Sequence, residues 1–215
     1  MILKILKVMT SVDIITNTYI ILDEEKKEAA IIDPGGEPEK IIDMISSLDA
    51  QIKYIIITHC HYDHIGALFK IKQYTNAKIF MSRIGSDGLN DPNINLSEYL
   101  DMNLPNIEVD SRVDDGDLIH IGDLEFKVLT TPGHTKGGIC LYSESEKLVF
   151  TGDTIFAGSW GRTDFPTGSM VEIMNSITAK ILVLPDETMV YPGHGRPTTV
   201  KDEKVIYNEL KETDM

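Results

Sequence analysis

Three histidines and an aspartate lie within six residues of one another in segment 58–66, whose sequence is Thr-His-Cys-His-Tyr-Asp-His-Ile-Gly. The candidate ligands are His59, His61, Asp63 and His64. Imidazole nitrogens and carboxylate oxygens are common metal ligands in proteins. Residues 54–57, Tyr-Ile-Ile-Ile, form the short apolar run expected of a buried strand. The segment therefore predicts a metal site at the edge of a sheet.

Three more residues of ligand type follow predicted strands later in the chain. They are His134, Asp153 and His194. Together with segment 58–66 they make seven nitrogen or oxygen ligands, which is more than one tetrahedral ion needs. Two ions that share one carboxylate would use all seven. We therefore expect a binuclear metal centre.

The hydrophobic pattern predicts the elements that position these ligands. Apolar and β-branched runs predict strands over residues 2–8, 18–22, 29–32, 53–57, 78–81, 118–121, 124–130, 139–143, 147–151 and 189–191. Helical spacing predicts helices over residues 38–48, 64–74, 169–181 and 200–211. Residues 82–105 are irregular and predict a surface excursion or a short helix. No repeat or linker marks a second unit, so we expect one α/β domain over residues 1–215.

The composition of the chain argues against some classes of binding partner. The chain has 215 residues, of which 42% are hydrophobic, and a formal net charge of -14 that opposes binding to nucleic acid. Two cysteines are too few for a disulfide framework, and no apolar run approaches the length of a membrane span. The first residues lack the features of a signal peptide. We expect a cytoplasmic protein without nucleic-acid or membrane partners, and the sequence leaves its oligomeric state open.

The ligand motifs resemble those of the metallo-β-lactamase-fold hydrolases. The resemblance rests on His59-Cys60-His61-Tyr62-Asp63-His64, Gly133-His134, Gly152-Asp153-Thr154 and Gly193-His194, and it runs from about residue 33 to about residue 199. It implies a four-layer αββα sandwich with the metals at one sheet edge. It also implies that His59, His61 and His134 hold the first metal and that Asp63, His64 and His194 hold the second. Asp153 would then bridge the two metals.

Within that family the chain most resembles the short, single-domain glyoxalase II-like hydrolases. The pair Asp63-His64 is similar to glyoxalase II rather than to lactamases with arginine in the second position, and residues 156–165 resemble the glyoxalase II loop after the bridging aspartate. We expect no additional C-terminal helical domain of the kind that contacts glutathione in eukaryotic-type glyoxalase II. Arg162 stands where that loop offers a basic residue to glutathione. It would either bind a substrate carboxylate as a planar fork or form a salt bridge within the loop.

The resemblance implies a binuclear metal-dependent thioesterase of the hydroxyacylglutathione hydrolase type, acting on a small-molecule thioester. Two Zn²⁺ ions are expected, with Fe or Mn as the other metals considered. Two close cations would lower the pKa of a shared water, and the resulting hydroxide would attack the acyl carbonyl while Asp63 orients it. A thiolate leaves readily, so the reaction requires no strong general acid.

Other functions of the same family remain open at this point. A mononuclear iron persulfide dioxygenase also resembles the chain, in His59, His61, His134, Asp153 and residues 161–165. A lactonase is a further alternative, because the same hydroxide attacks any activated acyl group. A nuclease would need a basic surface or an exosite, which the composition disfavours. A binding module without activity is the least favoured, since all the ligand types are present.

Four remaining residues carry structural expectations. His120 lies outside every motif, and we expect no functional role for it. Cys60 stands between two candidate ligands in an extended segment, so its side chain should point away from them. Cys140 lies in an apolar strand and is expected in the core. Asp33, at a strand end, is a candidate to brace a ligand histidine from behind.

Overall fold

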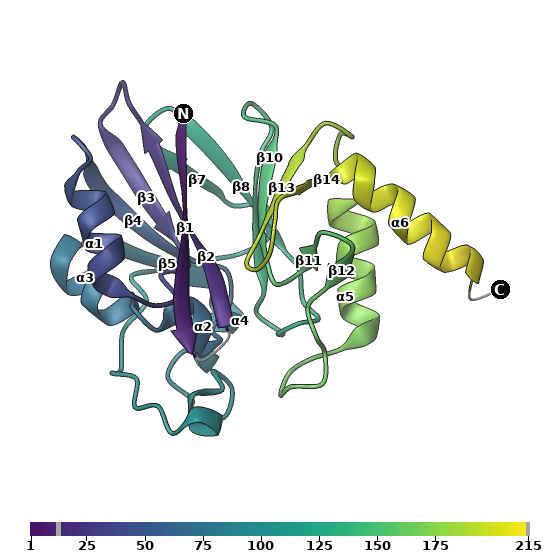
Figure 1. The fold of residues 1–215 in the computed structure, drawn as a ribbon, viewed down its shortest axis with the longest axis horizontal. Helices are drawn as coiled ribbons and strands as arrows, with labels where there is room; N and C mark the ends of the chain where they lie inside the picture. The colour runs from purple at the N-terminus through teal and green to yellow at the C-terminus, as the bar shows by residue number, and fades with distance from the viewer. Residues whose placement is uncertain (12–13, 214–215) are drawn as a thin grey trace.

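Two six-stranded sheets face each other across the centre of the protein (Figure 1). The computed structural model describes residues 1–11 and 14–213. The first sheet has the strand order β1-β2-β3-β4-β5-β6, with bounds β1 Ile2–Ser11, β2 Ile14–Asp23, β3 Glu28–Ile32, β4 Gln51–Ile57, β5 Lys78–Ser82 and β6 Ser111–Val113. Strands β1 to β3 form an antiparallel meander, and β3 to β6 run parallel.

The second sheet has the strand order β14-β13-β10-β9-β8-β7. Its strands are β7 Leu118–Ile121, β8 Leu124–Thr130, β9 Ile139–Ser143, β10 Leu148–Gly152, β13 Met189–Pro192 and β14 Thr198–Thr199. A separate hairpin, β11 Ile155–Phe156 and β12 Ser159–Trp160, follows the end of β10. Strands β6 and β14 and this hairpin are not among the predicted elements, since segments of two or three residues carry no measurable periodicity.

Eight helices or helical turns accompany the two sheets in the described part of the chain. They are α1 Pro38–Ser46, α2 Tyr62–Ile65, α3 Leu68–Thr75, α4 Arg83–Gly88, the 3₁₀ turn η1 Ser97–Leu100, α5 Met170–Ser176, the π-helical turn η2 Ile177–Ile181 and α6 Val200–Thr213. Helices α1 and α3 lie outside the first sheet, and α5 and α6 lie outside the second (Figure 1). The predicted αββα sandwich is confirmed. No helix in the described part of the chain is long and apolar enough to cross a membrane.

The side chains of β4 alternate between two apolar layers, one beneath α1 and α3 and the other between the two sheets. Ile55 and Ile57 pack with the buried residues of α1 and α3, whereas Ile56 faces the second sheet. All three side chains are fully buried. Successive residues of a strand point to opposite faces, so a continuous isoleucine run suits a sheet that is covered on both sides. A third apolar layer joins the second sheet to α5, η2 and α6.

The helix predicted over residues 64–74 is interrupted at Gly66 and Ala67. The chain instead forms the short helix α2, breaks at Gly66 and Ala67, and continues as α3. The amide of Ala67 donates to the carbonyl of Pro34 at 2.9 Å, so it is not available to the carbonyl of Asp63 one helical turn earlier. A Cβ on Gly66 would lie 2.4 Å from the carbonyl oxygen of Gly35. The loop after β3 therefore packs where a continuous helix would run.

Hydrogen bonds join the two sheets at the edge where the candidate ligands lie. The amide of Ile139 in β9 donates to the carbonyl of Thr58 at 2.9 Å, and the amide of Asn17 in β2 donates to the carbonyl of Gly193 at 2.7 Å. The side chain of Asn17 also donates to the carbonyl of Pro192 at 2.9 Å. These bonds fix the ends of strands from different sheets relative to one another.

Helix α6 is tied to the β11–β12 hairpin by a buried carboxylate. The side chain of Glu203 is 1% exposed and accepts hydrogen bonds from the amide of Gly158 at 3.0 Å and the hydroxyl of Thr198 at 2.7 Å. A buried carboxylate is tolerated only when hydrogen bonds replace its hydration. Glu203 thereby holds in place the hairpin that borders the candidate site.

Candidate metal centre

All seven predicted ligands meet at one edge of the sandwich. His59 and His61 follow β4, and Asp63 and His64 lie on α2, which begins directly after His61. The other three come from the second sheet, with His134 after β8, Asp153 directly after β10 and His194 after β13. All seven side chains are largely shielded from solvent. Strand ends from two sheets thus bring together residues far apart in the sequence.

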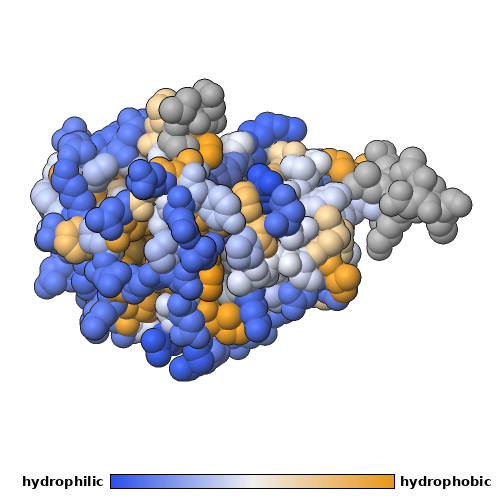
Figure 2. Space-filling view, turned by 90° about the horizontal axis from the view of Figure 1, so that it is seen from below, coloured by the Kyte–Doolittle hydropathy of each residue, from blue (hydrophilic) through white to orange (hydrophobic). Residues whose placement is uncertain are grey.

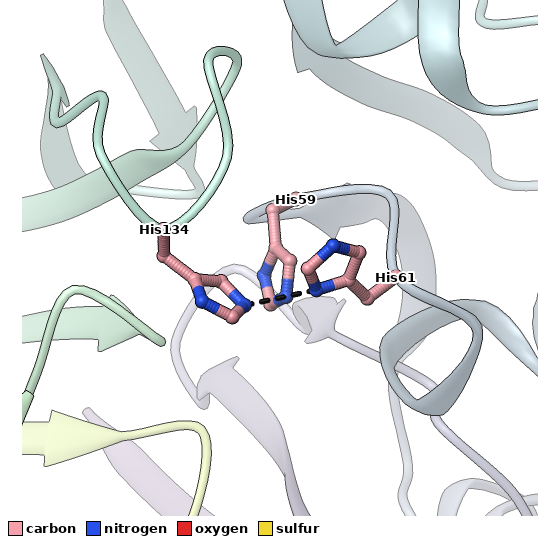
Figure 3. Close-up of side chains that lie close together, drawn as sticks. All are labelled: His59, His61 and His134. Atoms are coloured by element: carbon pink, nitrogen blue, oxygen red, sulfur yellow. Dashed lines mark hydrogen bonds between the residues drawn. The ribbon is translucent and has the colours of Figure 1, made fainter. Parts of the chain in front are cut away.

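Side-chain nitrogen and oxygen atoms gather in three overlapping groups, each with its atoms within 4.8 Å of one another. The groups are His59 with His61 and His134, Asp63 with His64 and His194, and His59 with His64 and Asp153. Figure 3 shows the first group, in which Nδ1 of His61 lies 2.9 Å from Nε2 of His134. The first two groups contain the residues predicted for the two metals, and the third joins His59 of one set to His64 of the other. Coordination by these residues stays a prediction.

Asp153 lies between the first two groups. Its Oδ2 is 3.6 Å from Nε2 of His134 and 3.4 Å from Nε2 of His194, and its Oδ1 is 3.3 Å from Nε2 of His64. One carboxylate oxygen can serve each of two neighbouring ions. Asp153 therefore lies beside residues of both proposed ligand sets, and its bridging role stays a prediction.

The hydrogen-bond partners of four imidazoles turn their Nε2 atoms towards the centre. Nδ1 of His134 donates to the carbonyl of Arg162, and Nδ1 of His194 donates to the carbonyl of Ile15, each at 2.7 Å. A carbonyl only accepts, so Nδ1 carries a proton in both residues, and Nε2 is the nitrogen that can offer a lone pair to an ion. These two contacts fix both the tautomer and the orientation of a prospective ligand.

Asp33 and Thr58 do the same for the other two histidines. Oδ2 of Asp33 lies 2.8 Å from Nδ1 of His64 and accepts a hydrogen bond from Oγ1 of Thr58 at 2.6 Å. Because that hydroxyl proton is directed to Asp33, Oγ1 can accept from Nδ1 of His59, 3.2 Å away. The contact expected between Asp33 and a candidate ligand histidine is therefore present.

Three buried polar atoms of the cluster find no hydrogen-bond partner among the residues that the structure describes: Nε2 of His59, Nε2 of His61 and Oδ1 of Asp153. Buried polar atoms without a partner are costly and uncommon in native proteins. For His59 and Asp153, an ion at the centre of the cluster removes that cost. The orphaned atoms and the nitrogen and oxygen donor set together fit a site for divalent metal ions.

The charges of the cluster also favour a cation. Burial opposes a charged His64, but the carboxylates of Asp153, Asp63 and Asp33 outweigh it and raise its pKa well above the usual value. Burial also opposes a charged His194, but the carboxylates of Asp153 and Asp63 outweigh it and raise the pKa of His194 to about 10. Positive charge is thus held near the two carboxylates.

The side of the cluster nearer His59 behaves differently. Burial lowers the pKa of His59 well below its usual value and that of His61 to about 3. Neutral imidazoles are the form that binds metals. The site therefore contains neutral nitrogen ligands on one side and two carboxylates that attract positive charge on the other.

A cavity of about 580 Å³ opens beside the cluster. His61, Asp63, His134, Asp153 and His194 form its polar wall. The remaining lining residues are Ile14, Tyr62, Leu96, Tyr99, Leu100, Phe156, Trp160, Gly161, Arg162 and Phe165. A volume in this range is typical of small-molecule sites. The irregular segment 82–105 contributes Leu96, Tyr99 and Leu100, a role that the sequence analysis did not assign.

Arg162 forms the salt bridge that the sequence analysis held as one of two alternatives. Its Nε and one terminal nitrogen donate to the two carboxylate oxygens of Asp164, at 2.7 and 2.6 Å. Its guanidinium carbon also lies 3.9 Å from the ring centre of Phe165. The side chain is 58% exposed at the cavity mouth. Binding of a substrate carboxylate by Arg162 stays a prediction.

The three residues expected to have structural roles lie outside the ligand cluster. Cys60 is buried in the layer between the first sheet and its helices, where burial raises the thiol pKa to about 12. Cys140 is buried in the layer under α5. His120 is exposed on β7, with Nε2 3.9 Å from the carboxylate of Glu125. The expectations for Cys60 and Cys140 are confirmed, and the absence of a functional role for His120 stays a prediction.

Gly193 lies so close to the cluster that a methyl group would displace two candidate ligands. A Cβ at this position would be 2.3 Å from Oδ1 of Asp153 and 2.6 Å from Cε1 of His64. We expect Gly193→Ala to lower metal content and to reduce turnover about a hundredfold, because small displacements of reacting groups are costly. Metal analysis and steady-state kinetics on the purified variant measure both.

Gly195→Ala is the matched control for this prediction. A Cβ at Gly195 meets nothing within 4 Å, although its φ of +79° makes the substitution strained. This control should therefore melt at a lower temperature and keep its metal. Normal metal content and turnover in Gly193→Ala would contradict the arrangement described above.

The family of the protein follows from comparison with known proteins. A family model described as the metallo-beta-lactamase superfamily matches residues 12–194. The chain belongs to the metallo-beta-lactamase superfamily, whose members are mostly metal-dependent hydrolases.

Individual relatives agree with this assignment. The chain is 39% identical over 199 residues to the hydroxyacylglutathione hydrolase GloC of Haemophilus influenzae, which covers 87% of this chain and 89% of that protein. The crystal structure of BLEG-1 B3 metallo-beta-lactamase matches with a TM-score of 0.88 and 32% identity, covering 95% of this chain and 97% of that one. ETHE1 from Myxococcus xanthus matches with a TM-score of 0.79 and 33% identity, covering 95% and 82% of the two chains. The predicted family and its glyoxalase II-like resemblance are confirmed.

Proposed function

We propose that this protein is a binuclear metal-dependent thioesterase of the hydroxyacylglutathione hydrolase type. The observation that carries the proposal is the convergence of seven side chains of ligand type, with four Nε2 atoms directed inwards, on one wall of a small-molecule cavity. The identity to GloC over most of both chains supports the choice of a thioester as the substrate.

The proposed ligands are His59, His61 and His134 for one ion and Asp63, His64 and His194 for the other, with Asp153 shared. Zn²⁺ suits this set of imidazole and carboxylate donors. When bound, two such ions supply Lewis-acid polarisation of a carbonyl and a water of lowered pKa.

The chain's own residues supply orientation and exclude bulk water. Asp63 lines the cavity, with Oδ2 3.1 Å from Nε2 of His194, and its carboxylate can accept a hydrogen bond from the attacking water and orient it. The rings of Phe156 and Phe165 border the cluster, at 6.0 Å from the rings of His194 and His61. No acidic group beyond the ligands is needed to release the product, because a thiolate is a good leaving group.

The test is turnover of S-lactoylglutathione by the zinc-loaded protein, followed by release of free thiol. Oxygen consumption on glutathione persulfide by the iron-loaded protein is measured in parallel. Thioester cleavage without oxygen uptake supports the proposal, whereas oxygen uptake without thioester cleavage overturns it. The second outcome would assign the alternative persulfide dioxygenase function, which the similarity to ETHE1 keeps in consideration.

Arg162 provides a separate prediction about the carrier part of the substrate. If its guanidinium receives a carboxylate of glutathione at the cavity mouth, Arg162→Ala should raise KM for S-lactoylglutathione about tenfold with little change in kcat. Asp164→Ala releases the same guanidinium from its present partner and should lower KM. If KM changed by the same amount and in the same direction in both variants, the Arg162–Asp164 salt bridge would only stabilise the loop.

A further inference from the structure

The cavity beside the metal cluster has a mainly apolar wall opposite its polar one. That wall consists of Ile14, Leu96, Leu100 and four aromatic side chains, Tyr99, Phe156, Trp160 and Phe165. They come from β2, from η1 and the residue before it, and from the region of the β11–β12 hairpin. In Figure 2, the face seen from below shows separate apolar patches within a hydrophilic surface. Side chains from three distant segments thus form one apolar surface next to the reacting centre.

The apolar wall has a buried part and a solvent-exposed part, as two of its leucines show. Leu96 is buried at 4% exposure, whereas Leu100, on the next turn of the same segment, is 44% exposed. Tyr99 reaches towards Phe165, with ring centres 6.3 Å apart. The apolar surface therefore extends from beside His61, through Phe165, to the mouth of the cavity.

The cavity offers little to a charged group. Among the described residues of its lining, Arg162 is the only lysine or arginine, and its Nε and one terminal nitrogen already donate to Asp164. The chain as a whole carries a formal charge of -14. A carrier thiol of the glutathione type bears carboxylates, which need cations or water as partners. Such a carrier is better placed at the exposed mouth, near Arg162, than against the aromatic wall.

We propose that the cavity holds the acyl part of the thioester and selects apolar chains or arylacyl groups over small hydroxylated ones. This inference rests on the proposed thioesterase function and names the substrate class of that site. An apolar acyl group would lie between Leu96, Leu100 and Phe165, with its carbonyl beside the metal cluster. An apolar acyl group that covers these side chains releases water from their surfaces, and this favours its binding over that of a small hydroxylated group.

The test compares glutathione thioesters that differ only in the acyl group: lactoyl, butanoyl, hexanoyl and phenylacetyl. We expect kcat/KM to rise about tenfold or more from the lactoyl to the hexanoyl thioester, since each buried methylene adds discrimination. Equal or falling values along the series would overturn the inference.

Leu100→Ala identifies the cavity as the source of the preference. It should reduce the advantage of the hexanoyl over the butanoyl thioester severalfold. Leu118→Ala, which removes the same atoms from a 51% exposed leucine on β7, should leave the advantage unchanged. A preference that survives Leu100→Ala as well as Leu118→Ala would place the acyl group elsewhere and contradict the proposal.

Ligand binding separates this inference from the thioesterase proposal. Trp160, the only tryptophan of the sequence, lines the cavity, so its fluorescence reports on occupancy. Non-hydrolysable ketone analogues of the hexanoyl and lactoyl thioesters are titrated into the zinc-loaded protein. Tighter binding of the hexanoyl analogue without turnover of any thioester would uphold the apolar site and overturn the thioesterase function. Turnover of the thioesters without a preference for the hexanoyl group, in rate or in binding of the analogues, would support the thioesterase function and overturn the apolar site.

Discussion

Replacement of Asp153 by alanine is expected to abolish both metal retention and thioester turnover. The Asp153 carboxylate faces His134 on one side and His64 and His194 on the other, at 3.3 to 3.6 Å. Without this carboxylate, each proposed ion loses a ligand. The site also loses one of the two negative charges that Asp63 and Asp153 contribute. We expect turnover to fall at least about a thousandfold, since electrostatic stabilisation at a reacting centre is usually the largest contribution to rate.

Metal content after gel filtration and thioester kinetics measure these effects. Asp49→Ala is the control, because this carboxylate is 97% exposed and pairs only with Lys27 in the structure. The control should keep both metal and activity. An active Asp153→Ala variant with a full complement of metal would refute the bridging assignment.

Asp33→Asn is expected to weaken metal binding about 10–100-fold, although Asp33 touches no proposed ion. The carboxylate accepts from the amide and hydroxyl of Thr58 and lies 2.8 Å from Nδ1 of His64. Asparagine keeps the shape and tolerates the φ of 51° at this position. Its oxygen must stay opposite the Thr58 amide N–H, so its amino group would donate towards Nδ1 of His64, and a neutral His64 would move its proton to Nε2. The ring would then present an N–H to the metal in place of a lone pair.

The same substitution should lower the free energy of unfolding by about 1–3 kcal/mol, because a fully buried hydrogen-bonded group loses acceptors. Asp23→Asn is the matched control. Asp23 is also buried and accepts from backbone amides of Glu25, Lys26 and Asp123, but it lies on β2 in a turn away from the site. Calorimetric metal titration of both variants decides the prediction. Equal metal affinity in Asp33→Asn and Asp23→Asn would show that Asp33 has no role in orienting His64.

Much of the metal centre could be predicted from the sequence because its chemistry is local. The apolar run of β4 ends directly before His59, and alternation along that strand requires a sheet covered on both faces. Residue type and strand-end position therefore predicted which side chains would meet. The hydrogen bond between Asp33 and His64 could be anticipated for the same reason, since the parallel strands β3 and β4 end side by side.

The parts that could not be predicted depend on contacts between distant segments. The carbonyl of Ile15 orients His194, yet a carbonyl has no sequence signature. The break between α2 and α3 depends on the carbonyl of Pro34, which local helix spacing does not register. Tyr99 and Leu100 line the cavity from a segment without regular periodicity. Their role becomes visible only once the fold brings that segment across the site.

The number of divalent ions bound per chain tests the central claim most directly. The metal-free protein is titrated with Zn²⁺ in a calorimeter, and the bound metal is then quantified after removal of the excess. The arrangement of seven ligands around Asp153 predicts two ions per chain at saturation, with thioester turnover appearing as the second ion binds. Saturation at a single ion, or no retained metal, would contradict a binuclear centre.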